Sequence, residues 1–444
     1  MPVRDWRSAR ATSGILATIA LLASLGLLPW LDKPVFPDEG ASLYSAQLGW
    51  SALWQHSRVV DLVLLPYYSF LHLWIQPSDS IAWARFLSLL AYGLTVFLVG
   101  HLGVRLGGRS CGVLAAIVAG ANPLLVTAAL SARPYALSAL AATASAVALL
   151  RWLEGGEVRW VWWFCVASIA TLLLQMFAIL APFFVLVAAI ALKPRMFRGR
   201  WRALVAPIVL ILAAAVSFVI LGVSQRSQIA WIPSPFRGAQ LMRAIAGPAS
   251  GGHDHYAIFV LAIAIVAIAA GLWAVSRGSF RRARLDLRLL AILLAWATLP
   301  TATLVAGSLV QPVFLDRYVT SSVPGLAIAL AALTAWAFNG IAVRLAVRSR
   351  VIVESAALGI AAVVLFFAFS VPAAQLTYGE AISHGLLGDH RVAIIGVEGG
   401  RYVEMAEQAK LVRQDDGWLA DGQTLAAQAA PLKAGRTGAG PWPR

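Results

Sequence analysis

Residues 13–31 read SGILATIALLASLGLLPWL, and residues 36–40, a few positions later, read FPDEG. The first run is apolar over about 20 residues, the length that a helix needs to cross the hydrocarbon core of a bilayer. The second run places two neighbouring carboxylates, Asp38 and Glu39, at the predicted membrane boundary. Only 12% of the chain is charged, so an acid pair at this boundary indicates a function beyond folding.

The composition extends this picture to the whole chain. Its 444 residues are 60% hydrophobic, with a mean hydropathy of +0.78, which excludes a soluble globular protein. The apolar runs are continuous rather than alternating, which excludes a transmembrane β-barrel. We therefore predict an all-α polytopic membrane protein, with residues 13–31 as an uncleaved first span rather than a signal peptide. Cys111 and Cys165 fall in or beside apolar segments, so neither a disulfide framework nor a metal cluster is predicted.

About eleven apolar runs, separated by polar breaks, are candidate transmembrane helices. They are residues 13–31, 82–102, 111–130, 136–150, 161–176, 178–192, 203–223, 256–275, 289–307, 322–340 and 352–371. A further apolar patch, 62–75, is too short to span the membrane and is predicted to lie along its surface or to dip into it.

The basic residues decide the predicted orientation. Lys and Arg crowd the alternate short loops that face the cytoplasm if the N-terminus is inside, for example around 193–202 and 277–288. The positive-inside rule then predicts a multi-pass protein of the cytoplasmic membrane with its N-terminus inside and its C-terminus outside. The formal net charge of +15 follows from this topology, with anionic membrane lipid as its partner and no need for nucleic acid.

Two parts of unequal size are predicted. Residues 1–371 form a transmembrane domain, in which the outer loops 32–81 and 224–255 are long. Residues 372–444 form a small extracytoplasmic segment, in which 391–397 has the pattern of a strand and the Gly- and Pro-rich end is predicted to be disordered.

Asp38 has two interpretations. It precedes a segment that suits a helix lying in the membrane interface, and it is placed to be the N-cap of that helix. Glu39 beside it, and polar residues in the other outer loops, favour a functional site instead. The other residues predicted to converge on this site are Tyr44, Arg58, Asp61, Arg133, Tyr135, His253, His255, Arg317 and Tyr318.

These partners also have plainer interpretations. A single arginine at a helix end, such as Arg133 or Arg317, commonly extends to lipid headgroups. Several arginines that face one outer cavity would instead bind a phosphate, because guanidinium contacts its oxygens bidentately. His253 and His255 could hold a divalent metal, but alternate histidines in a Gly-rich loop are not a metal motif, and no metal site is assigned.

The sequence resembles the GT-C glycosyltransferases, and within them the protein O-mannosyltransferases and the lipid A aminoarabinose transferase. The resemblance covers roughly residues 10–340 and lies in the order and placement of its elements. The matching residues are Asp38, Glu39 and Tyr44, then His72, Leu73 and Trp74, then Arg85, Asn122 and Pro123, then 132–137, and finally Arg317, Tyr318 and Pro324.

The resemblance implies that residues 1–371 form a catalytic domain that uses a polyprenyl-phosphate sugar as donor. Asp38 would then be the general base toward a hydroxyl of a glycan, glycolipid or protein, and Glu39 would orient it or hold the acceptor. Arg133 and Arg317, with Arg58, would stabilise the departing phosphate, and backside attack predicts inversion.

The excess of Arg over Lys, with high Ala, is reminiscent of actinobacterial membrane proteins, where enzymes of this family build wall glycans that contain mannose or arabinose. Mannose is therefore the favoured sugar and arabinose the second. The main competing hypothesis is a transporter or flippase for a lipid-linked anionic glycoconjugate. That protein would place ionisable residues inside its spans. A non-catalytic scaffold is also compatible with the sequence, and so is a lipid-dependent glycan polymerase or ligase.

Overall fold

The computed structural model describes residues 6–32, 37–229, 232, 234–236, 241, 248, 287–342, 411–414 and 417–420. These residues form a bundle of helices and one short antiparallel hairpin. In the first third of the chain, the elements are α1 (Trp6–Leu27), η1 (Leu28–Trp30), α2 (Pro37–Gln47), α3 (Trp50–Val59), η2 (Leu62–Leu64), α4 (Leu65–Trp74), α5 (Ile81–Gly107), α6 (Arg109–Gly120) and α7 (Pro123–Ala129).

The remaining elements continue the bundle and add the hairpin. They are α8 (Tyr135–Gly155), α9 (Val158–Leu174), η3 (Met176–Ile179), α10 (Leu180–Leu192), α11 (Pro194–Phe197), α12 (Arg202–Ser224), η4 (Arg226–Ile229), α15 (Leu287–Gly307), η6 (Asp316–Ser322), α16 (Val323–Ala342), β1 (Leu411–Gln414) and β2 (Gly417–Ala420).

The described helices are those of a multi-pass membrane protein. Six of them are long and apolar enough to cross a membrane, or seven if one bent pair counts as a single span. The predicted runs 161–176 and 178–192 are two shorter apolar helices on either side of Gln175, and the patch 62–75 is also a short helix. The predicted spans 256–275 and 352–371 lie outside the described residues, so the total of eleven stays a prediction.

The bent pair corrects one predicted span. Residues 111–130 were predicted as one helix, but α6 and α7 meet at an angle of 61°. Pro123 has no amide hydrogen to continue a helix, and its ring clashes with the preceding turn. The side chain of Asn122 accepts a hydrogen bond from the amide of Leu125 at 3.1 Å and so caps the new helix.

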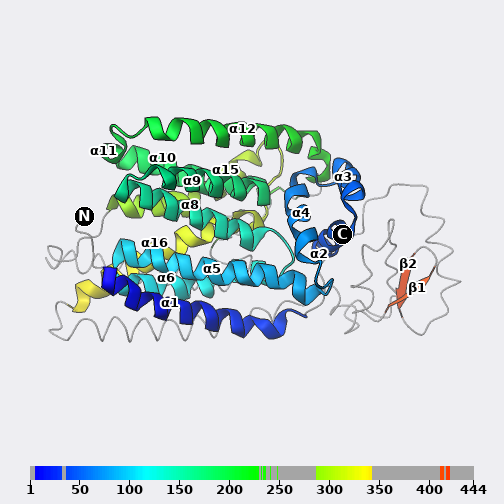
Figure 1. The fold of residues 1–444 in the computed structure, drawn as a ribbon, viewed down its shortest axis with the longest axis horizontal. Coiled ribbons are helices and arrows are strands. Elements are labelled where there is room, and N and C mark those ends of the chain that lie inside the picture. Colours follow the sequence, from blue (N-terminus) through cyan, green and yellow to red (C-terminus); the bar gives the residue numbers. More distant parts are fainter. Residues whose placement is uncertain are drawn as a thin grey trace.

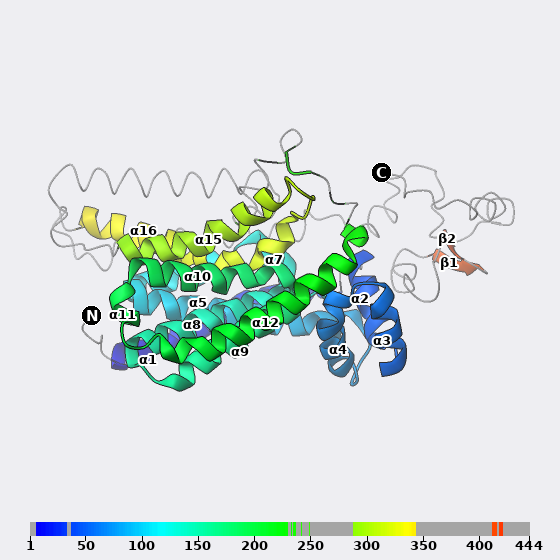
Figure 2. The same cartoon turned by 90° about the horizontal axis from the view of Figure 1, so that it is seen from above.

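The long helices run side by side, and the short helices of the first predicted outer loop gather at one end (Figures 1 and 2). This end, where α2, α3 and α4 lie, is called the α2–α4 end below, and α11 lies at the opposite end. Among the closest helix pairs are α5 with α6, α8 with α9, and α10 with α15. The bundle therefore holds the acid pair of α2 at one end of its spans.

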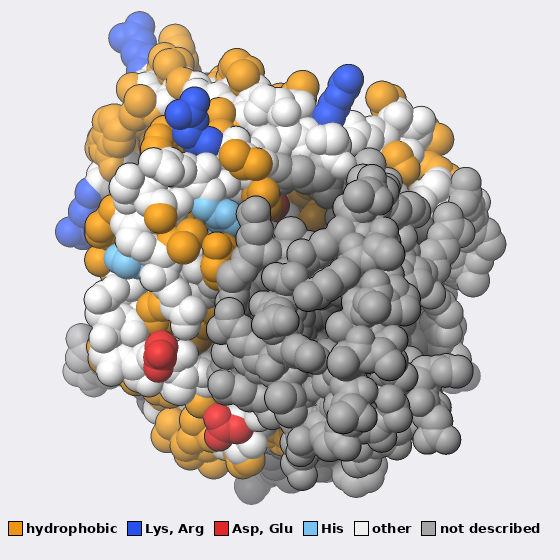
Figure 3. Space-filling view, turned by 90° about the vertical axis from the view of Figure 1, so that its right-hand side faces the viewer, with side chains coloured by type: hydrophobic (Ala, Val, Ile, Leu, Met, Phe, Trp, Pro, Cys, Tyr) orange, Lys and Arg blue, Asp and Glu red, His pale blue; other side chains and the backbone are white. Residues whose placement is uncertain are grey.

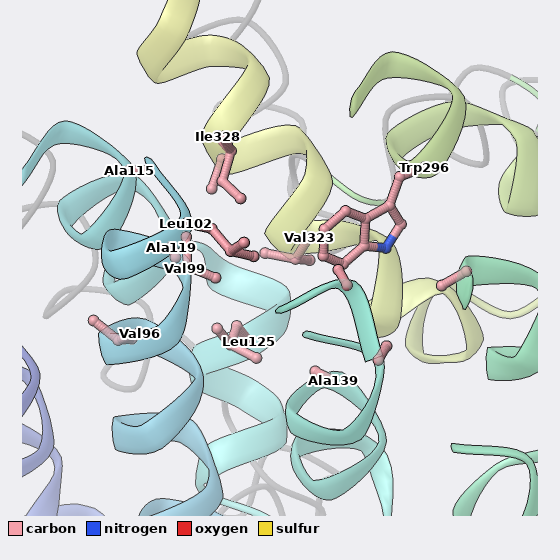
Figure 4. Packing of buried hydrophobic residues seen from close by; sticks show 14 of the residues in the cluster. Val96, Val99, Leu102, Ala115, Ala119, Leu125, Ala139, Trp296, Val323 and Ile328 are labelled. Atoms are coloured by element: carbon pink, nitrogen blue, oxygen red, sulfur yellow. The ribbon is translucent and has the colours of Figure 1, made fainter. Parts of the chain in front are cut away.

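The main core is built from buried, largely aliphatic side chains that most of the described helices contribute. Figure 4 shows the contact between α5, α6, α8, α15 and α16 with the short helix α7 between them. Trp296 of α15 is 2% exposed, and its indole nitrogen donates to the carbonyl oxygen of Ser321 at 2.8 Å. The indole thereby anchors η6, the segment that carries Arg317, to the core.

Many large apolar side chains lie on the outside of the bundle. On α12, for instance, Val216, Ile220 and Val223 are more than half exposed, as expected for a helix face in contact with lipid. Figure 3 looks onto the α2–α4 end, where hydrophobic side chains lie exposed among histidines and basic residues. Exposed Trp50 and Trp54 of α3 belong to this end.

Close packing of α5 on α6 depends on glycine. A Cβ atom at Gly112 would lie 2.6 Å from the carbonyl oxygen of Gly100 and 2.8 Å from the amide nitrogen of Val104. Backbone atoms cannot move aside as the end of a side chain can. The two helices therefore approach as closely as they do because position 112 has no side chain.

We predict that Gly112→Ala destabilises the protein by about 1–3 kcal/mol through overpacking. The matched control is Gly14→Ala on α1, where a Cβ would meet no described atom within 4 Å and where alanine favours the helix. Thermal unfolding of both purified variants in detergent, followed by tryptophan fluorescence, measures the difference. Equal midpoints for the two variants would contradict the prediction.

Candidate functional site

The acid pair lies inside the first turn of α2. The helix begins at Pro37, a residue suited to the first helical position. Asp38 therefore belongs to the helix and is not the N-cap that the sequence suggested. Successive side chains of a helix diverge by about 100°, so Asp38 and Glu39 face different surroundings although they are neighbours in the sequence.

Glu39 forms a buried, bidentate ion pair with Arg85 of α5. Arg85 Nε donates to Glu39 Oε1, and Arg85 Nη2 to Glu39 Oε2, each at 2.9 Å. The side chain of Glu39 is 2% exposed and that of Arg85 is 0% exposed. Arg85 Nη1 also donates to the carbonyl oxygen of Leu31 at 2.7 Å, just after η1. The pair thus joins α2, α5 and the end of the first span.

The same carboxylate fixes the connection between α7 and α8. The backbone amide of Ala132 donates to Glu39 Oε1 at 2.8 Å. The hydroxyl of Ser88, one turn after Arg85 on α5, donates to the carbonyl oxygens of Ser131 at 2.7 Å and Arg133 at 3.4 Å. One turn of α5 therefore positions both α2 and the loop that carries Arg133.

Asp38 faces two arginines from distant parts of the chain. Its Oδ2 atom lies 2.8 Å from Arg317 Nη2, and both side chains are partly exposed, at 33% and 27%. Arg133 Nη1 donates to the backbone carbonyl of Asp38 at 3.1 Å and to the hydroxyl of Ser42 at 2.9 Å. The structure thus brings together three predicted site residues from α2, the α7–α8 loop and η6.

Two predicted tyrosines complete this group. The guanidinium of Arg133 lies 5.8 Å from the ring centre of Tyr135. The rings of Tyr135 and Tyr318 are 6.5 Å apart, and Phe177 of η3 lies 5.3 Å from Tyr318. Burial acts to lower the pKa of Arg133, but Tyr135, Tyr68 and Asp38 around it outweigh this effect and raise that pKa. Arg133 is therefore a permanent positive charge.

Asp61 approaches the same group through α4. The hydroxyl of Tyr68 donates to Asp61 Oδ2 at 3.1 Å. Burial is the largest effect and raises the pKa of Tyr68. The charge of Asp61 raises this pKa further, whereas Arg133 lowers it. Burial also raises the pKa of Tyr67, whose hydroxyl has no hydrogen-bond partner among the described residues. Both phenols therefore stay protonated beside Arg133.

The other predicted residues do not join this group in the described part of the chain. Tyr44 packs edge-on against His56, with ring centres 5.4 Å apart, and the side chain of Arg58 is exposed at the end of α3. His253 and His255 lie outside the described residues. Among the described residues, no group of three His, Cys, Asp or Glu side chains could hold a metal ion.

Sequence reasoning did not assign a role to Arg85, Ser42 or Tyr68. One signal for Arg85 was present, because an arginine within a membrane segment is expected to have a partner. Ser42 and Tyr68 carried no such signal, since a serine and a tyrosine are ordinary residues of an interfacial helix. Chemically, the assembled group offers one carboxylate and two guanidiniums, which suits an anionic ligand beside a group that loses a proton.

No family model and no curated protein matched the sequence. Among solved structures, the fold is similar to ArnT from Cupriavidus metallidurans, in the apo state (17% identity, TM-score 0.49, 90% of this chain and 75% of that chain) and bound to undecaprenyl phosphate (16%, 0.46, 89% and 75%). It is also similar to the arabinosyltransferase EmbB from Mycobacterium smegmatis (18% identity, TM-score 0.43, 76% of this chain and 31% of that chain). At these identities, the similarity concerns the fold alone.

We predict that Glu39→Ala or Arg85→Ala each lowers the free energy of unfolding by about 3–5 kcal/mol, because the remaining charge is buried without its partner. The control is Arg105→Ala, which breaks the more exposed Arg105–Glu154 pair. This change should alter the free energy of unfolding by only about 0–1 kcal/mol. Thermal unfolding in detergent compares them. A shift for Arg85→Ala no larger than that of the control would refute the structural role.

Proposed function

We propose that this protein is an inverting membrane glycosyltransferase that moves a sugar from a polyprenyl-phosphate donor to an acceptor hydroxyl at the outer face of the membrane. The observation that carries the proposal is the meeting of two arginines at Asp38 at the α2–α4 end: Arg317 pairs with its carboxylate, and Arg133 donates to its backbone carbonyl. The sequence predicted each of these residues separately, from three different loops.

The donor fits the physical setting of the group. An isoprenoid chain is apolar and can lie in lipid beside the spans, while the sugar phosphate reaches the polar end of the bundle. Arg133 and Arg317 supply two fixed positive charges for the phosphate oxygens. A phosphate is a good leaving group once its negative charge is stabilised, so the departing oxygen needs no separate acid.

Asp38 would be the general base in this reaction. The acceptor oxygen attacks the anomeric carbon and its proton passes to Asp38, while the bond from that carbon to the phosphate oxygen breaks and its electron pair leaves with the polyprenyl phosphate. In the structure Asp38 is paired with Arg317. A donor phosphate that takes Arg317 would free the carboxylate for the acceptor, which implies that the donor binds before the acceptor.

Glu39 has a different role in the proposal. Its oxygens are occupied by Arg85 and the amide of Ala132, so orienting the neighbouring Asp38 suits it better than holding the acceptor. Mannose remains the favoured sugar and arabinose the second. The acceptor is a glycan, a glycolipid or a protein hydroxyl.

A transporter or flippase, the competing hypothesis, needs ionisable residues along the spans. The buried arginine of α5, Arg85, is neutralised by its ion pair with Glu39. The buried hydroxyls of Thr95 in α5 and Thr143 in α8 donate to carbonyls of their own helices. They are satisfied locally. The charges of Asp38, Arg133 and Arg317 meet at one end of the bundle instead, which favours chemistry at the membrane surface.

We predict that Asp38→Asn slows sugar transfer by roughly 10²–10⁴-fold, the usual contribution of a general base, at normal protein level. In the native host, one outer glycan linkage should disappear and one polyprenyl-phosphate sugar should accumulate, which names the donor. Asp79→Asn, an exposed acid of the same predicted loop, is the control and should change neither. Unchanged glycans and lipid pools in the Asp38→Asn strain would rule out Asp38 as the base.

We further predict that Arg317→Gln weakens binding of undecaprenyl phosphate by roughly 10–100-fold, because a charged hydrogen bond to the phosphate is lost. Arg317→Lys should recover part of the affinity, since the charge returns without the bidentate geometry. The exposed Arg226→Gln is the matched control. Binding to full-length protein in nanodiscs measures all three, and equal affinities for Arg317→Gln and wild type would exclude a phosphate role.

A further inference from the structure

Arg133 is held at one terminal nitrogen by a single turn of α2. Its Nη1 atom donates to the backbone carbonyl of Asp38 at 3.1 Å and to the hydroxyl of Ser42 at 2.9 Å. The hydroxyl of Ser42 donates in turn to the same carbonyl of Asp38 at 3.2 Å. Because Nη1 carries two hydrogens, the two acceptors on α2 occupy both of them.

The backbone that carries Arg133 is fixed by other residues. The amide of Ala132 donates to Glu39 Oε1 at 2.8 Å, and the hydroxyl of Ser88 donates to two carbonyls of the α7–α8 loop at 2.7 and 3.4 Å. These bonds hold the loop without the side chain of Ser42. The bond between Ser42 and Arg133 therefore orients the guanidinium rather than the path of the chain.

Ser42 differs in this respect from a neighbouring serine of α2. Serine hydroxyls within helices often donate to the carbonyl four residues earlier, and Ser45 does so to Ala41 at 2.8 Å. Both serines are buried, at 0% and 1% exposure. Among the hydrogen bonds of the described residues, Ser42 alone of these two also accepts one from an arginine. Ser45 is therefore an internal reference for the ordinary role.

Arg85 shows how a guanidinium of this protein binds an anion. Its Nη1 atom donates to the backbone carbonyl of Leu31, while its Nε and Nη2 atoms donate to the two oxygens of Glu39. Arg133 uses Nη1 in the same way, for the carbonyl of Asp38. Its Nε atom is buried without a hydrogen-bond partner among the described residues, which is costly. The edge formed by Nε and Nη2 therefore suits two oxygens of one anion.

We propose that Ser42 is a positioning residue, which holds Nη1 of Arg133 on α2 so that the Nε–Nη2 edge faces the phosphate of the donor. The inference rests on the proposed function, in which Arg133 stabilises that phosphate. It adds the atoms that make the contact and the residue that orients them. Because the carboxylate of Asp38 belongs to the same turn, α2 fixes the proposed base and the phosphate-binding edge together.

The test is binding of undecaprenyl phosphate to full-length protein in nanodiscs, with a double-mutant cycle between positions 42 and 133. Ser42→Ala should weaken binding by about 3–10-fold, the value of one hydrogen bond. Arg133→Met, which keeps a long side chain and removes every N–H group of the guanidinium, should weaken it by roughly 10–100-fold. In the Arg133→Met background, Ser42→Ala should have almost no further effect, because the serine acts through the guanidinium.

Two further variants separate this role from packing. Ser42→Cys fills the space of the hydroxyl, but a thiol is a weak acceptor, so it should bind as weakly as Ser42→Ala. Ser45→Ala is the matched control, because it removes the same kind of bond within the same helix. It should leave the affinity unchanged in both backgrounds.

The outcomes distinguish this inference from the function on which it rests. Multiplicative effects of Ser42→Ala and Arg133→Met, equal affinities for Ser42→Ala and Ser45→Ala, or wild-type affinity in Ser42→Cys would each overturn the positioning role. Failure of the wild-type protein to bind undecaprenyl phosphate, or equal affinities for Arg133→Met and wild type, would instead overturn the donor site of the proposed function.

Discussion

The arrangement of the α2–α4 end depends on the buried pair of Glu39 and Arg85. Two opposite charges in an apolar bundle are tolerated only when they neutralise each other and their remaining hydrogen-bonding atoms find partners. Here the carbonyl of Leu31 and the amide of Ala132 fill that need. Satisfying this one ion pair therefore locates the end of the first span, the first turn of α2 and the α7–α8 loop. The need to neutralise two buried charges thus determines where these three segments of the chain meet.

This arrangement explains why adjacent acids behave differently. Helical geometry turns Glu39 toward the bundle and Asp38 toward the surface. The carboxylate of Glu39 is held in its ion pair with Arg85. Asp38 is partly exposed and lies beside Arg317. A polar site at the end of a helical bundle needs both: a rigid attachment and a group that is free to exchange partners. The sequence Asp-Glu supplies them in consecutive residues.

Much of this could be predicted from the sequence, because apolar length and charge placement are strong signals in a membrane protein. The spans around 13–31, 82–102 and 203–223 all correspond to helices. The break at Asn122 was missed because hydropathy does not register a proline-induced bend. Convergence of Asp38, Arg133 and Arg317 was predictable from their shared predicted side of the membrane. The pairing of Glu39 with Arg85 was not, because it requires knowing how two helices rotate about their axes.

The order of Glu39 and Arg85 in the chain has a consequence for biogenesis. Glu39 precedes Arg85 by 46 residues, so it is synthesised first. An arginine in an apolar helix is disfavoured during insertion unless a partner is available. When α5 emerges, α1 and α2 have already been synthesised. The carboxylate of Glu39 is therefore available to pair with Arg85 as α5 inserts. The pair thus couples insertion of the second span to assembly of the loop that precedes it.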